Sequence, residues 1–259
     1  MLCEGKVAVV SGLGPNLGRS VAVALAREGA TLVLAARRET RLAKAREEIE
    51  SLGGTAMTVV TDVTDPASCQ ALAEAVVSEH GRCDILVNNA FDDGNSTSFA
   101  DSDLGEWRRT FDVNVFGTLQ LTQAMLPALR AAGDARVIMV NTMSTYKIER
   151  GFGAYAASKG ALATATKTLA LELGADGIRV NGIHPGYIYG KGVEWYLNHQ
   201  ATERGVSFQE VYDELASEAA LGYLPPADEV AGSVVFFASP LATCITGQSL
   251  GVNAGHWLT

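Results

Sequence analysis

The sequence is poor in cysteine, proline and positive charge, and it contains no long apolar run. In 259 residues there are four cysteines and seven prolines, and 20 Lys and Arg stand against 29 Asp and Glu. The net charge of −9 argues against general binding of nucleic acids or anionic membranes, since both are themselves negative. No apolar run approaches the roughly 18 residues that a membrane-spanning helix needs, so we expect no membrane span.

The cysteines and histidines are too scattered to form a metal site. The cysteines lack any C-x-x-C spacing, and the start of the chain lacks the basic and apolar regions of a secretory signal. We therefore expect reduced thiols and a cytoplasmic protein. Because the histidines show no ligand spacing, we expect no metal. These residues are Cys3, Cys69, Cys83 and Cys244, and His80, His184, His199 and His256.

Short apolar runs rich in β-branched residues alternate with helical patterns along the whole chain. Their continuous apolar character indicates strands buried on both faces of a parallel sheet. One long helical pattern covers 103–132 and ends at Gly133. We predict an α/β fold, a single Rossmann-like doubly wound domain over 1–259 with a seven-stranded parallel sheet flanked by helices. The predicted strands are 6–11, 31–35, 56–60, 84–88, 136–140, 178–183 and 247–253.

The segment 187–226, between the sixth and seventh predicted strands, is too long for an ordinary connection. It holds a large share of the aromatic residues, among them Tyr187, Trp195 and Tyr212. Two interpretations are open. The segment is either a pair of helices that packs its aromatics into the protein interior, or a lid over a substrate pocket.

A glycine-rich turn follows the first strand. Gly12, Gly14 and Gly18 lie between this strand and the next helical pattern. At such a turn the backbone approaches a ligand closely, and the helix amino terminus presents free N–H groups that suit a pyrophosphate. A plain tight turn also explains a glycine cluster, but the strand before it and the helix after it favour nucleotide binding.

The end of the second strand bears on which dinucleotide is bound. Proteins that bind NAD commonly place an acidic residue there for the ribose 2′-hydroxyl, but this chain has Ala36 followed by Arg37 and Arg38. A guanidinium attracts a 2′-phosphate. The sequence therefore favours NADP, with NAD as the alternative if the arginines only begin a solvated helix.

With these motifs the chain resembles the short-chain dehydrogenase/reductase family, in its single-domain form. The glycine loop is similar to the family motif T-G-x-x-x-G-x-G, with Asn16 replacing the middle glycine. The segments "TDV" at 61–63, "NNA" at 88–90 and "HPGYI" at 184–188 are similar to further family motifs, although Phe91 stands where glycine is usual. Together with Arg37, the cofactor-binding residues implied are Gly12, Asn16, Leu17, Gly18, Asp62, Val63, Asn89, Ala90, Tyr155, Lys159, Pro185, Gly186 and Ile188.

The resemblance also implies a set of four catalytic residues. Tyr155 and Lys159 match the family's Y-x-x-x-K, and Asn114 matches an Asn of the long helix. Thr142 falls on the position of the catalytic serine in an ungapped alignment. Ser144 is the alternative for that hydroxyl.

The spacing of Tyr155 and Lys159 is that of neighbours on one helical face. A free phenol has a pKa near 10, and bringing it to about 7 requires roughly 4 kcal/mol of preferential phenolate stabilisation. An ammonium about 4–5 Å away supplies roughly that much at an effective dielectric near 20. We therefore expect Lys159 to lower the pKa of Tyr155.

These observations predict an NAD(P)-dependent oxidoreductase that interconverts a secondary alcohol and a ketone, with Tyr155 as acid and base. The aromatics suggest a moderately large apolar substrate. The alternatives are a non-catalytic dinucleotide-binding regulator or sensor, and an epimerase or dehydratase on the same fold. The resemblance implies a homotetramer assembled through 103–132 and 154–174, with a homodimer as the alternative.

Overall fold

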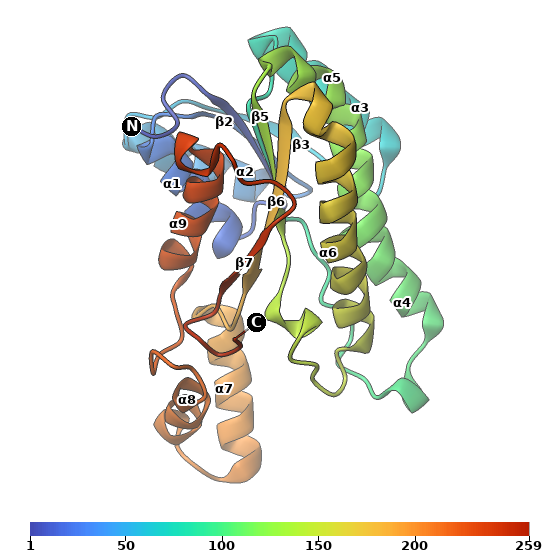
Figure 1. The fold of residues 1–259 in the computed structure, drawn as a ribbon. Coiled ribbons are helices and arrows are strands. Elements are labelled where there is room, and N and C mark those ends of the chain that lie inside the picture. The colour runs from blue at the N-terminus through green and yellow to red at the C-terminus, as the bar shows by residue number, and fades with distance from the viewer. Residues whose placement is uncertain (259) are drawn as a thin grey trace.

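A seven-stranded, all-parallel sheet forms the centre of the computed structural model, which describes residues 1–258 (Figure 1). The strand order is β3-β2-β1-β4-β5-β6-β7. This order confirms the predicted fold class, and each predicted strand boundary lies within two residues of the observed one. The strands are β1 (Val7–Ser11), β2 (Thr31–Ala36), β3 (Ala56–Val60), β4 (Ile85–Asn88), β5 (Ala135–Val140), β6 (Ile178–Pro185) and β7 (Ser249–Val252).

Helices cover both faces of the sheet (Figure 1). The helices are α1 (Leu17–Arg27), α2 (Glu39–Ser51), α3 (Pro66–His80), α4 (Leu104–Phe111), α5 (Thr118–Ala132), α6 (Gly153–Leu173), α7 (Lys191–Arg204), α8 (Phe208–Ser217) and α9 (Ala227–Ala238). Buried residues of α1, α2 and α9 form one core with the sheet, and those of α3, α5 and α6 form a second. Every helix in this described part of the chain is too short or too polar to cross a bilayer.

The strand order reverses direction at β1, whose two neighbours are β2 and β4. The loops that leave the carboxyl ends of β1 and β4 therefore separate and open a crevice between them, which is where ligands bind in such sheets. The glycine loop follows β1, and the "NNA" segment ends β4. The topology thus places both motifs at one crevice.

The predicted helix over 103–132 is not continuous. A π-helical turn, Asp112–Gly117, separates α4 from α5. Such turns interrupt the regular hydrogen-bond ladder and occur often at functional sites. Asn114, a predicted catalytic residue, lies inside this turn and is fully buried.

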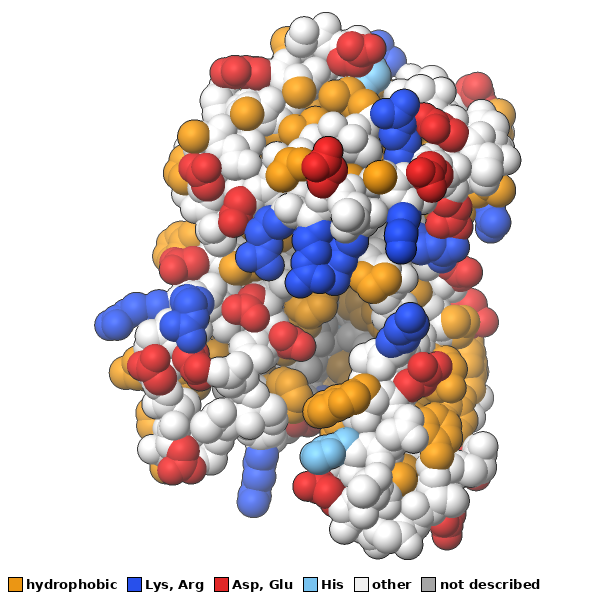
Figure 2. Space-filling model, turned by 180° about the vertical axis from the view of Figure 1, so that it is seen from behind, with side chains coloured by type: hydrophobic (Ala, Val, Ile, Leu, Met, Phe, Trp, Pro, Cys, Tyr) orange, Lys and Arg blue, Asp and Glu red, His pale blue; other side chains and the backbone are white. Residues whose placement is uncertain are grey.

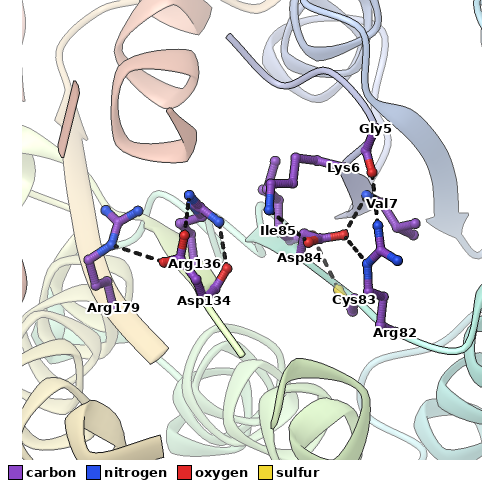
Figure 3. A network of polar contacts seen from close by, with 10 residues as sticks. All are labelled: Gly5, Lys6, Val7, Arg82, Cys83, Asp84, Ile85, Asp134, Arg136 and Arg179. Atoms are coloured by element: carbon purple, nitrogen blue, oxygen red, sulfur yellow. Dashed lines mark hydrogen bonds and ion pairs between the residues drawn. The ribbon is translucent and has the colours of Figure 1, made fainter. Parts of the chain in front are cut away.

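A buried carboxylate, that of Asp84, lies at the amino ends of the neighbouring strands β1 and β4 (Figure 3). Asp84 accepts hydrogen bonds from Val7 N at 2.9 Å, Lys6 Nζ at 3.1 Å and Arg82 Nε at 3.0 Å. Burial opposes the charge of Asp84, but these hydrogen bonds hold its pKa below the usual value. The contact therefore connects β1 to the segment before β4.

The insertion 187–226 contains α7 and α8 and has a small hydrophobic cluster of its own. Tyr189 packs edge-on against Tyr212, with ring centroids 5.7 Å apart. The backbone N–H of Tyr189 donates to Pro225 O at 2.9 Å, which joins the two ends of the insertion. Several of its aromatics thus pack against one another within the insertion.

Candidate active site

A cleft of about 540 Å³ opens at the carboxyl ends of the strands. It brings together all the predicted catalytic and cofactor-binding residues except Asn114. Those lining it are Gly12, Asn16, Leu17, Gly18, Arg37, Asp62, Val63, Asn89, Ala90, Thr142, Tyr155, Lys159, Pro185, Gly186 and Ile188. Motifs far apart in the sequence therefore form one site.

The glycine loop packs tightly against the segment that follows β4. Gly12 has φ of +66°, and a Cβ there would lie 2.3 Å from the Ala90 backbone. A Cβ on Gly18 would lie 2.8 Å from Asn89 Nδ2, which itself donates to Gly12 O at 2.8 Å. These two glycines therefore allow the loop to lie directly against the "NNA" segment.

The residues at the start of α1 fit the diphosphate of a dinucleotide. Asn16 precedes the helix without capping it through its side chain, and Leu17 and Gly18, the first helical residues, line the cleft. The first N–H groups of a helix have no acceptor within the helix, and they lie at the positive end of its dipole. A helix start left uncapped beside a cleft is a site for an anion.

Basic side chains lie at the end of the cleft beside β2. Arg37, Arg38 and Arg41 line it together with Ala36, and Figure 2 shows Lys and Arg side chains gathered along one edge of a hollow in this face. Arg41 lies four residues after Arg37, just inside α2, and the sequence reasoning missed it. Its spacing could have identified it, because Arg41 lies four residues, about one helical turn, after Arg37.

The four-residue spacing of Tyr155 and Lys159 places them together near the start of α6. The amine lies 6.0 Å from the centroid of the Tyr155 ring. Lys159 is 2% exposed, and its Nζ donates to Val140 O at 2.7 Å, at the end of β5. The lysine is thus held between the helix and the sheet.

The expectation that Lys159 lowers the pKa of Tyr155 is wrong for this structure. Burial raises the pKa of Tyr155 to about 12, and burial lowers the pKa of Lys159 to about 7. Attraction between the two charges favours ionisation of the phenol, but the cost of removing each charge from water is the larger effect here. With a pKa near 7 the amine is only partly charged at neutral pH, so its effect on the phenol is weak.

Of the two candidate hydroxyls, Thr142 lies in the cleft and Ser144 is not among the lining residues. Hydrogen bonding by the Thr142 side chain lowers the pKa of Tyr155, against the larger effect of burial. Ser144 turns toward Thr142, since its N–H donates to Thr142 Oγ1 at 3.2 Å. On the backbone side of Thr142, its carbonyl oxygen lies 2.8 Å from Nδ1 of His184.

The side chain of Asn114 holds the segment after β4. Its Oδ1 accepts from Asp92 N at 2.7 Å, and its Nδ2 donates to Asp92 O at 2.8 Å and to Ser158 Oγ at 2.9 Å. Both side-chain N–H groups of Asn114 therefore already donate hydrogen bonds within the protein. This side chain connects the π-helical turn to α6 and fixes the backbone beside Tyr155.

Three residues after "NNA" also line the cleft. They are Phe91, Asp92 and Asp93. The ring centroid of Phe91 lies 6.5 Å from that of Tyr155. Sequence reasoning missed the two aspartates, although their position directly after a ligand-binding motif was a usable signal.

Comparison with known proteins agrees with this geometry. A family model described as "Enoyl-(Acyl carrier protein) reductase" matches residues 12–256. The chain belongs to the short-chain dehydrogenase/reductase family.

Relatives with named activities extend over the whole chain. Galactitol 2-dehydrogenase of Agrobacterium fabrum is 32% identical, with 100% of both chains covered. The 7alpha-hydroxysteroid dehydrogenase of Escherichia coli is 29% identical over 97% of this chain and 94% of the relative. The structure of L-sorbose reductase from Gluconobacter frateurii, complexed with NADPH and L-sorbose, matches with a TM-score of 0.94 and 31% identity, covering 100% and 99% of the two chains.

The family match, the named relatives and the cleft support one functional class. This short-chain dehydrogenase/reductase is an NAD(P)-dependent oxidoreductase that acts on CH–OH groups. The comparisons give no support to a non-catalytic role.

Proposed function

We propose that the protein interconverts a secondary alcohol and a ketone, with Tyr155 transferring the proton. The observation that supports this most directly is that Tyr155, Thr142 and Lys159 line the same cleft as the glycine loop. A bound nicotinamide dinucleotide supplies or accepts the hydride. The phenol then has to give a proton to the substrate oxygen in one direction and take it back in the other.

The neighbouring groups act on the same oxygen and the same proton. The Thr142 hydroxyl donates a hydrogen bond to the substrate oxygen and stabilises the negative charge that develops there. Lys159, whose pKa of about 7 lies near physiological pH, exchanges a proton easily at Nζ. Asn114 acts as a positioning residue, because its side chain is committed to Asp92 and Ser158.

Replacing Tyr155 by Phe tests this proposal. We expect Tyr155→Phe to lower turnover at least about 100-fold, the usual loss when acid–base catalysis is removed, and to leave dinucleotide affinity within twofold. Tyr146→Phe, which removes a phenol outside the cleft, is the matched control. The substrate panel includes ketones, secondary alcohols and an enoyl thioester, because the matching family model carries that description. Near-normal turnover by Tyr155→Phe rejects the role, and dinucleotide binding without any turnover by the wild type identifies a sensor.

For the cofactor we propose NADP, with NAD as the alternative. Arg37, Arg38 and Arg41 provide guanidinium groups at the end of the cleft where a ribose 2′-phosphate would lie, and Ala36 carries no repelling carboxylate. We propose Asp62, in the "TDV" motif, for the adenine amino group. It lines the same cleft, and Thr64 Oγ1 donates to its Oδ1 at 2.7 Å. Burial opposes the charge of its carboxyl, but this hydrogen bond and the charge of Arg37 hold its pKa below the usual value. The NADPH-bound structure of L-sorbose reductase is consistent with this choice.

We propose that the insertion 187–226 closes over the substrate. Ile188, at its start, lines the cleft, and Gly190 lies against Asn16 of the glycine loop. The apolar substrate suggested by the aromatic content of the sequence stays a prediction with less support, since Tyr189, Phe208 and Tyr212 pack into the insertion's own cluster.

A homotetramer remains our proposal for the assembly, with a homodimer as the alternative. Apolar side chains are exposed on the helices expected to form the interface. Leu104 is 55%, Phe116 55% and Leu171 87% exposed. Burying such side chains between subunits is favourable by about 25 cal/mol per Å² of apolar surface. The cytoplasmic location stays a prediction from the sequence.

A further inference from the structure

One charged side chain in the catalytic cleft has no assigned role. Asp93 lines the cleft with Tyr155 and Thr142, and it is exposed. Within residues 1–258 it takes part in no ion pair, and no side chain or backbone N–H donates to its carboxylate. Its neighbour Asp92 differs, because the Asp92 carboxylate accepts from Gly94 N at 3.1 Å. Asp93 is therefore the carboxylate that is free to meet a substrate.

The backbone around Asp93 is fixed on both sides. Asn114 holds the N–H and the carbonyl of Asp92. On the other side, Gly94 N donates to Asp92 Oδ1 at 3.1 Å, so a hydrogen bond spans Asp93. The backbone position of Asp93 is therefore set by hydrogen bonds, while its exposed carboxylate stays available to a donor.

Asp93 also acts electrostatically on the catalytic phenol. Its negative charge raises the pKa of Tyr155, in addition to the larger effect of burial. A substrate group that neutralises this charge would therefore lower the pKa of Tyr155 and increase the fraction of phenolate that can accept a proton. Conversely, an anionic group held about 7 Å from the carboxylate, at an effective dielectric near 40, is disfavoured roughly tenfold.

We propose that Asp93 is a specificity-determining residue that accepts a hydrogen bond from a donor group, a hydroxyl or an ammonium, on a carbon next to the reacting one. This inference rests on the proposed alcohol–ketone activity and narrows its substrate class. The substrate is a polyol or an amino alcohol, or the matching ketone, and it carries no carboxylate at that position. The exposed ring of Phe91 leaves room for an apolar remainder beside the donor.

The test compares secondary alcohols that differ only at the neighbouring carbon. One series is 1-amino-2-propanol, 1,2-propanediol, 2-butanol and lactate, and a phenyl series has the same four groups. In the wild type we expect kcat/KM to be at least tenfold higher for a donor-bearing member than for the methyl member, and lowest for the carboxylate. Whichever of the amine and the diol has the higher kcat/KM identifies the donor group.

Asp93→Asn should lower kcat/KM at least tenfold for the amine and severalfold for the diol, and change it less than twofold for the methyl member. Asp93→Lys should favour the carboxylate. Glu47→Gln, which removes an exposed carboxylate of α2 away from the cleft, is the control.

Two further measurements do not depend on substrate ranking. In Asp93→Asn the Tyr155 pKa, followed by NMR of labelled tyrosine, should fall. Calorimetry on Tyr155→Phe with cofactor should show tighter binding of the donor-bearing member.

The outcomes separate the two proposals. Turnover with an unchanged ranking in Asp93→Asn, or a wild type that prefers the carboxylate, overturns the role of Asp93 and leaves the alcohol–ketone activity in place. A Tyr155 pKa that does not move in Asp93→Asn overturns it as well. Absence of turnover for both series and for their ketones counts against the proposed function itself.

Discussion

The buried amine of Lys159 makes a quantitative prediction about stability. Its pKa is about 7 in the folded protein, against an ordinary value of 10.5. Between these two pH values the unfolded chain binds a proton that the folded chain has released. The free energy of unfolding contributed by this residue is therefore retained at high pH and lost as the pH falls from about 10.5 toward 7. From pH 10 to pH 7 the loss amounts to about 3 kcal/mol.

Lys159→Met removes this titration and keeps most of the side-chain volume. The variant loses the hydrogen bond to Val140 O, which costs roughly 1 kcal/mol at every pH. At pH 10 we expect Lys159→Met to be less stable than the wild type. At pH 7 we expect it to be more stable, since it no longer buries an amine that would be charged in water.

The assay is urea unfolding of both proteins at several pH values from 7 to 10. The difference in unfolding free energy between variant and wild type should change by about 3 kcal/mol across this range. Taking the difference cancels other titrating groups, such as the buried thiol of Cys83, whose pKa burial raises to about 12. Lys167→Met, which removes an exposed amine of the same helix, should leave the profile parallel to that of the wild type. A parallel profile for Lys159→Met would refute the burial argument.

Three further predictions concern the cofactor, the sheet and the assembly. Arg37→Ala should weaken NADP(H) at least tenfold, about 1.4 kcal/mol, and NAD(H) less than twofold; equal weakening in titration calorimetry would withdraw the 2′-phosphate assignment. Asp84→Ala should lower the free energy of unfolding by about 2–3 kcal/mol, because Val7 N loses its buried acceptor, and a loss below 0.5 kcal/mol in urea would contradict this. Leu171→Glu should shift the protein to a smaller species in sedimentation velocity, and an unchanged boundary would exclude this face as the interface.

The fold could be predicted from the sequence because its signals are local and repeat along the chain. Strands buried on both faces produce continuous β-branched runs. The ends of helices follow from capping residues such as Asp65-Pro66 at the start of α3, where Asp65 accepts from Ala67 N at 3.0 Å. The π-helical turn around Asn114 could not be predicted in this way. Within this turn Asn114 contacts Asp92 and Ser158, which lie 22 and 44 residues away, and a local sequence pattern does not show such distant contacts.

For the same reason, the sequence predicted some residues of the site and missed others. Residues within motifs, from Gly12 to Ile188, line one cleft as the family resemblance implied. Arg41 and Asp93 were missed, because no motif contains them and only the folded chain brings them to the cleft. The direction of the Tyr155 pKa shift was predicted wrongly, because spacing gives the distance between two charges but says nothing of burial, which here has the larger effect.

These shifts have one consequence for how Tyr155 and Lys159 work together. Burial keeps the phenol protonated and leaves the amine close to half protonated near neutral pH. Burial, rather than attraction between the two groups, therefore sets both protonation states in this structure. Positive charge added beside the phenol will lower the pKa of Tyr155, whereas the carboxylate of Asp93 raises it. The protonation of Tyr155 therefore responds to the charges that surround it in the cleft.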